Sequence, residues 1–135
     1  MSKRGNLFVV SGFSGSGKGT VMKQLCKNEQ YALSISCTSR APREGETNGK
    51  EYYFISHEEF VKRQAEGYFL ESAIYVNKGY GTPLGFVEEN LAAGKDVILE
   101  IEMQGALQVK KTYPDTILIF ITPPSAAAVS YTHLT

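Results

Sequence analysis

The sequence lacks the features that mark secreted, membrane-spanning and general nucleic-acid-binding proteins. It has only two cysteines, Cys26 and Cys37, and no second Cys/His pair, so neither a disulfide framework nor a zinc site is indicated. Its 14 basic and 14 acidic side chains cancel, whereas proteins that neutralise many nucleic-acid phosphates usually carry a basic excess. The apolar run at 7–10 is far too short for a signal peptide or a membrane span. We therefore expect a cytoplasmic protein that binds neither nucleic acid nor membranes.

Apolar runs and helical patterns alternate along the 135 residues. The expected core strands lie at 7–10, 31–36, 96–101 and 117–121, and the expected helices between them lie at 20–28, 83–94 and 103–113. This order predicts an α/β fold in which helices flank a parallel sheet. Residues 37–82 contain shorter extended segments and one helix, which begins with a capping box at Ser56 and Glu59 and ends before Gly67. They resemble a small α+β insertion.

A glycine-rich segment lies directly between the first predicted strand and the first predicted helix. It has the spacing Gly, four residues, Gly-Lys, from Gly12 to Lys18. The glycines let successive backbone N–H groups point at phosphate oxygens, the helix N-terminus adds partial positive charge, and Lys18 adds a full charge. The alternative is a purely structural glycine-rich turn, but such a turn would rarely have this spacing of glycines, lysine and threonine by chance. The segment therefore predicts a P-loop NTPase-type core that binds a nucleoside triphosphate.

The residue after Lys18 is Gly19, and the hydroxyl that usually meets magnesium follows one place later at Thr20. This Gly-Lys-Gly-Thr form resembles the nucleoside monophosphate kinases. The expected ATP-binding residues are Gly12, Phe13, Ser14, Gly15, Ser16, Gly17, Lys18, Gly19 and Thr20.

The resemblance narrows to the guanylate kinases after the second predicted strand. Residues 36–43, followed by Gly45-Glu46 and by 48–54, are similar to that family's acceptor segment, and the likeness runs from about Leu7 to Ser125. It implies ATP-dependent phosphorylation of GMP to GDP with Mg²⁺ as the cofactor, and ATP and GMP as the bound partners.

Two arginines supply what an acceptor phosphate requires. A nucleoside monophosphate carries a near-dianionic phosphate, which calls for planar bidentate donors, and Arg40 and Arg43 can provide them. Tyr52 and Tyr80 match the family's other phosphate contacts. Phosphoryl transfer depends on positioning and charge neutralisation, so we expect Lys18, Arg40 and Arg43 to be catalytic.

The expected base-selecting residue is Glu71, with help from Ser36 and Thr82. Guanine presents N1–H and the 2-amino group side by side, so one carboxylate can accept both hydrogens. Adenine presents an acceptor at N1, which would face the carboxylate lone pairs. Each residue of the predicted acceptor site also has an alternative interpretation when it is taken singly. Arg40 and Arg43 could be a solvated pair of loop charges, Tyr52 and Tyr80 core or edge aromatics, and Glu71 an exposed strand carboxylate.

Two carboxylates, Glu100 and Glu102, end the third expected core strand on one side of the chain. Ligands of open α/β sheets gather at such strand ends. The resemblance implies that these acids lie near magnesium and the acceptor base, so Thr20, Glu100 and Glu102 are the candidate metal ligands, partly through water. Glu102 stands where the family frequently has aspartate and is also a candidate GMP-binding residue. The alternative is a pair of salt-bridged strand-end acids.

The expected domains are a P-loop core at 1–36 and 83–125, a GMP-binding insertion at 37–82, and a tail at 126–135 that differs from the family. A guanylate kinase would continue into an arginine-rich lid helix and a further core strand, and no arginine follows Arg63. We therefore expect a truncated or chimeric chain without lid and last core strand, which could be inactive. The alternative is a short disordered extension.

Two other functions are compatible with parts of the pattern. One is a non-catalytic guanylate-kinase-like module that holds phosphorylated peptides, although such modules typically have a degraded phosphate loop. The other is a P-loop kinase for a different small acceptor, which Glu71 together with Arg40 and Arg43 disfavours.

Overall fold

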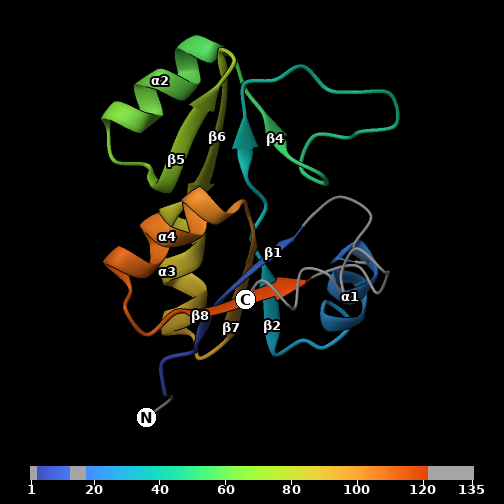
Figure 1. Cartoon of the computed structure of the whole chain (residues 1–135), viewed down its shortest axis with the longest axis vertical. Coiled ribbons are helices and arrows are strands. Elements are labelled where there is room, and N and C mark those ends of the chain that lie inside the picture. Colours follow the sequence, from blue (N-terminus) through green and yellow to red (C-terminus); the bar gives the residue numbers. More distant parts are fainter. Residues whose placement is uncertain (1–2, 13–17, 122–135) are drawn as a thin grey trace, which may run out of the picture.

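The computed structural model describes residues 3–12 and 18–121, which form two four-stranded sheets with helices around them (Figure 1). The first sheet contains β1 (Leu7–Gly12), β2 (Tyr31–Leu33), β7 (Asp96–Glu100) and β8 (Ile117–Ile121). The second contains β3 (Cys37–Thr38), β4 (Tyr53–Phe54), β5 (Phe69–Tyr75) and β6 (Lys78–Pro83). The helices are α1 (Lys18–Leu25), α2 (His57–Ala65), α3 (Leu84–Ala92) and α4 (Met103–Thr112).

The first sheet is parallel throughout, in the order β2-β7-β1-β8. Its central strands are buried on both faces, as their continuous apolar sequences predict. On one face Val9 and Leu99 pack against Val87 and Leu91 of α3 and against residues of α4, and on the other face Ile98 and its neighbours pack against α1. Figure 1 shows α1 and the α3–α4 pair on opposite sides of this sheet. The predicted α/β fold with a central first strand is confirmed.

Among the described strands, β8 lies at an edge of the first sheet and is covered less well than β1 and β7. Its residues 117–120 are 40–47% exposed, which is unusual for an Ile-Leu-Ile-Phe sequence in a parallel sheet.

The second sheet is mixed, in the order β4-β3-β6-β5. The strands β5 and β6 form an antiparallel hairpin, β3 is antiparallel to β6, and β4 is parallel to β3. In Figure 1 this sheet and α2 lie above the first sheet. The strand β3 was not predicted from the sequence, because two residues are too few to show a periodicity.

The predicted start and end of α2 are confirmed, with one difference. Ser56 is the N-cap, and its side chain accepts a hydrogen bond from the Glu59 backbone N–H at 3.1 Å. The Glu59 carboxylate, however, accepts from Arg63 Nε at 3.1 Å rather than completing a capping box. Gly67 follows the helix with φ of +75°, a backbone conformation that favours glycine. Within the two described ranges, the helices are all too short or too polar to cross a membrane.

Candidate functional site

A cavity of about 640 Å³ lies between the two sheets. The carboxyl ends of β1, β2 and β7 border it through Gly12, Leu33 and Glu100, and residues of the second sheet and its loops form the other side. Parallel sheets place ligands at this end of their strands. The predicted acceptor residues that line the cavity are Ser36, Arg40, Arg43, Tyr52, Glu71, Tyr80 and Glu102. The structure therefore brings together residues that the sequence separates by up to 66 positions (from Ser36 to Glu102).

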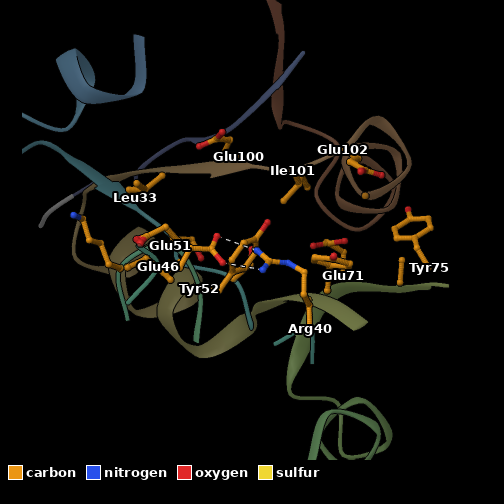
Figure 2. A pocket seen from close by; sticks show the side chains of 18 of the residues that line it. Leu33, Arg40, Glu46, Glu51, Tyr52, Glu71, Tyr75, Glu100, Ile101 and Glu102 are labelled. Atoms are coloured by element: carbon orange, nitrogen blue, oxygen red, sulfur yellow. Dashed lines mark hydrogen bonds and ion pairs between the residues drawn. The ribbon is translucent and has the colours of Figure 1, made fainter. Parts of the chain in front are cut away.

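Figure 2 shows the guanidinium of Arg40 in the middle of this cavity, with Glu46 and Tyr52 to one side and Glu71 and Tyr75 to the other. Arg40 is only 6% exposed. Its Nη1 and Nη2 donate to the two carboxylate oxygens of Glu46 at 2.8 and 3.0 Å, a bidentate ion pair. This hydrogen-bonded pair raises the pKa of Arg40 and lowers the pKa of Glu46 to about 2. Both groups are charged at neutral pH.

Aromatic rings surround the same guanidinium. The Arg40 Cζ atom lies 5.2 Å from the ring centroid of Tyr52 and 5.8 Å from that of Phe54, within cation–π range. The Tyr52 and Tyr80 rings are edge to face, with centroids 6.0 Å apart. A cation with two nearby phenolic groups can bind an oxyanion, so this part of the cavity suits a phosphate.

Glu71 provides a buried carboxylate on another wall of the cavity. It is 8% exposed, and its Oε1 accepts a hydrogen bond from Thr82 Oγ1 at 2.7 Å. This bond follows from the sheet register, because Glu71 of β5 pairs directly with Thr82 of β6. Burial raises the pKa of Glu71, the hydrogen bond from Thr82 opposes that shift, and the charge of Glu102 adds to it. Thr82 is buried behind Glu71 and supports it from there.

Gly105 in α4 makes room for Glu71. A Cβ atom at position 105 would lie 2.6 Å from Glu71 Oε2, so any larger residue would displace the carboxylate. This glycine was not predicted from the sequence, because it looks like an ordinary helix residue until the packing of α4 on β5 is known.

Glu100 and Glu102 both line the cavity, and Glu102 is the N-cap of α4 without a side-chain capping bond. Among the residues the structure describes, no cluster of three or more potential metal ligands exists. Mg²⁺ commonly uses one or two carboxylates together with waters and substrate phosphates. These acids therefore fit an ion that arrives with a nucleotide, but not a metal site built from protein ligands alone.

The predicted phosphate loop is described only at its ends. Gly12 closes β1 and α1 begins at Lys18, so strand and helix flank the loop in the predicted order. Phe13, Ser14, Gly15, Ser16 and Gly17 lie outside the described residues. Thr20 is exposed on the first turns of α1.

Other cavity-lining residues were missed from the sequence. Ser34 Oγ and Glu51 Oε2 are buried atoms without a hydrogen-bond partner among the described residues, and both residues line the cavity. Unpartnered buried polar atoms are costly, so water or a bound ligand is expected to satisfy them. The available signal was that Glu51 lies within the acceptor segment 48–54 and that Ser34 lies two residues before Ser36.

Comparisons with known proteins agree with this geometry. The guanylate kinase family model matches residues 4–133, a range that extends past Ser125, where the likeness noted from the sequence ends. The guanylate kinase of Clostridium tetani is 55% identical over 123 residues, which are 91% of this chain and 59% of that protein. The enzyme of Listeria monocytogenes serotype 4b is 54% identical over 126 residues, which are 92% of this chain and 62% of that protein.

Among solved structures, the crystal structure of guanylate kinase from Anaplasma phagocytophilum matches with a TM-score of 0.79 at 32% identity. The match covers 98% of this chain and 68% of that one. The chain thus spans about 60% of the length of the curated relatives it matches.

Proposed function

Because this chain belongs to the guanylate kinase family, we propose that it serves the transfer of the γ-phosphoryl group of ATP to GMP, which yields ADP and GDP. The observation that carries the proposal is that Arg40 and Glu71 line one cavity. The chemistry of Arg40 suits a phosphate, and that of Glu71 suits a guanine base. A nucleoside monophosphate has a phosphate and a base at its two ends and requires both.

The phosphate end would orient the acceptor. Arg40, Arg43, Tyr52 and Tyr80 would bind the GMP phosphate through N–H and O–H donors and hold one of its oxygens in line with the γ-phosphorus. Positioning of this kind supplies much of the rate enhancement in phosphoryl transfer, because the protein contributes no covalent step.

The base end would select guanine. The Glu71 carboxylate, with Oε1 held by Thr82, would accept the N1–H and 2-amino hydrogens, and Ser36 and Glu102 line the same cavity. Adenine would place a lone pair against a buried carboxylate, an arrangement that loses binding energy.

The donor end would use the phosphate loop from Gly12 to Thr20, with the Lys18 charge on the ATP phosphates. Mg²⁺ bound with ATP supplies neutralisation of phosphate charge, and Thr20, Glu100 and Glu102 would hold it, partly through water. The spacing of the loop also favours the enzyme over the non-catalytic binding module, because a module that only holds a phosphorylated peptide does not need a triphosphate loop.

The proposed base contact has a consequence for pH. Glu71 must be ionised to accept two hydrogens from guanine, and its pKa is raised by burial. An ordinary glutamate has a pKa of about 4.3. As the pH is lowered, GMP affinity should therefore begin to fall at a higher pH than such an ordinary carboxyl group would cause. The same raised pKa affects the stability of the free protein. The native state keeps the Glu71 proton up to a higher pH than the unfolded chain does, so the free energy of unfolding should decrease as the pH rises from the unfolded-state pKa to the native-state pKa.

Calorimetric titration with GMP from pH 8 to pH 5 measures this effect. The phosphate of GMP also titrates, near pH 6, and this titration changes GMP affinity by itself. The control is Glu71→Gln, because the phosphate still titrates when GMP binds this variant but the carboxyl group at position 71 is absent. Parallel pH profiles for the two proteins would contradict the assigned role of Glu71.

The direct test of the proposed function is ADP formation from ATP in the presence of GMP or AMP. Turnover with GMP and not with AMP is expected of the enzyme. GMP binding without turnover would support the acceptor site alone, and equal turnover with both would favour a kinase for a different acceptor.

A further inference from the structure

Glu46 contacts both arginines of the phosphate end. Its two oxygens accept from Arg40 Nη1 and Nη2, and its Oε1 also accepts from the Arg43 backbone N–H at 2.7 Å. We propose that Glu46 is a positioning residue that fixes Arg40 and the Arg43 backbone so that they receive the acceptor phosphate. The proposal rests on the proposed function, because it concerns the same phosphate.

The donor count leaves room for a ligand on Arg40. A guanidinium has five N–H groups. Glu46 uses two of them, and the Ala41 carbonyl accepts a third from Nη1 at 2.9 Å. The remaining two are on Nε and Nη2, which form the adjacent edge of the planar group and are used by neither Glu46 nor Ala41. The hydroxyl groups of Tyr52 and Tyr80 also interact with this guanidinium, and both can bind the same phosphate. Glu46 therefore orients Arg40 and still leaves an edge that can donate two parallel hydrogen bonds to a phosphate.

The surrounding backbone explains why an anchor is needed. Arg40 and Arg43 lie in a segment between β3 and β4 that has no regular helix or strand of its own. A long arginine side chain loses considerable rotamer entropy when it is fixed. Glu46 fixes it before the ligand arrives, so that less of the binding free energy is spent on ordering.

The negative charge of Glu46, taken alone, would weaken GMP binding, which is the opposite of what a positioning role predicts. Glu46 is negative, and the acceptor phosphate is close to dianionic, so a carboxylate that merely competed for Arg40 would weaken GMP binding, and its removal would strengthen it. The Nε–Nη2 edge, which Glu46 does not occupy, and the additional Arg43 contact favour positioning over competition. The sign of the mutational effect separates the two.

The experiment is calorimetric binding of GMP and of guanosine to the full chain and three variants. Glu46→Gln removes the charge and one acceptor, and we expect GMP affinity to fall about 10- to 100-fold. Guanosine, which has no phosphate, should bind this variant as it binds the wild type. Glu46→Asp should lie between the two. Glu44→Gln, which removes an exposed carboxylate of the same segment, should leave GMP affinity unchanged.

Four outcomes would overturn the proposal. Unchanged GMP affinity in Glu46→Gln would show that Arg40 needs no anchor, and tighter GMP binding would show that Glu46 competes with the phosphate. An equal loss of GMP and guanosine binding would indicate general damage to the site. If the wild-type chain binds no GMP, the proposed function fails and the proposal for Glu46 fails with it. Unchanged or tighter GMP binding in Glu46→Gln would overturn only the proposal for Glu46 and leave the proposed function intact.

Discussion

Arg40→Ala is expected to weaken GMP binding by about 100-fold or more, because a buried charged partner of the phosphate is lost. Arg40 is 6% exposed and lies between the Glu46 carboxylate and the Tyr52 ring, so its removal would also leave the Glu46 carboxylate without its partner. Arg40→Lys keeps the charge and loses the planar pair of donors, and an intermediate loss is expected. Calorimetric titration with GMP measures both.

The matched control is Arg4→Ala. Arg4 also forms an ion pair with a glutamate, Glu88, at 2.7 Å, but it does not line the cavity. Its removal should leave GMP affinity unchanged. The assignment of Arg40 to the acceptor phosphate would be wrong if Arg40→Ala bound GMP as tightly as Arg4→Ala while both variants retained the wild-type unfolding temperature.

Glu71→Gln is expected to lower GMP affinity by about 100-fold and to narrow the preference for GMP over AMP. The glutamine amide keeps one acceptor oxygen, but its NH₂ group replaces the second. This NH₂ group would face a guanine hydrogen that the carboxylate accepts with a lone pair. The same NH₂ group removes the repulsion of an adenine N1 acceptor, so AMP binding should not fall with GMP binding. Calorimetric titration of the variant with GMP and with AMP gives the ratio of affinities.

Glu66→Gln is the control for this substitution, because Glu66 is an exposed carboxylate at the end of α2. It should change neither affinity. A Glu71→Gln variant that lost GMP and AMP binding equally would indicate a structural role for Glu71, supported by its bond to Thr82, rather than selection of the base.

The sequence predicted the core elements well and the second sheet only partly. The strands β1, β7 and β8 have uninterrupted apolar runs because they belong to a sheet with helices on both faces, and such runs are easy to identify. Their order across the sheet was not predicted, since periodicity carries no information on which strands are neighbours. The two-residue strands β3 and β4 form through pairing with their neighbours rather than through local preference.

The candidate site was predictable where a motif carried it and was missed where only packing did. Arg40, Tyr52 and Glu71 were identified through the resemblance, and the structure brings them into one cavity. Glu46 belongs to the segment that resembles the family but was not predicted to be a site residue, because its bonds to Arg40 depend on the path of an irregular segment. Gly105 was missed because its role depends on packing in the folded structure. A Cβ atom at this position would lie 2.6 Å from Glu71 Oε2.

The most direct test of the central claim, that one cavity holds GMP by its phosphate and its base, is calorimetric titration of this chain with GMP and with AMP. We predict saturable binding of GMP and an affinity for AMP that is lower by about 100-fold or more. Equal affinity for both nucleotides, or binding of neither, would contradict it.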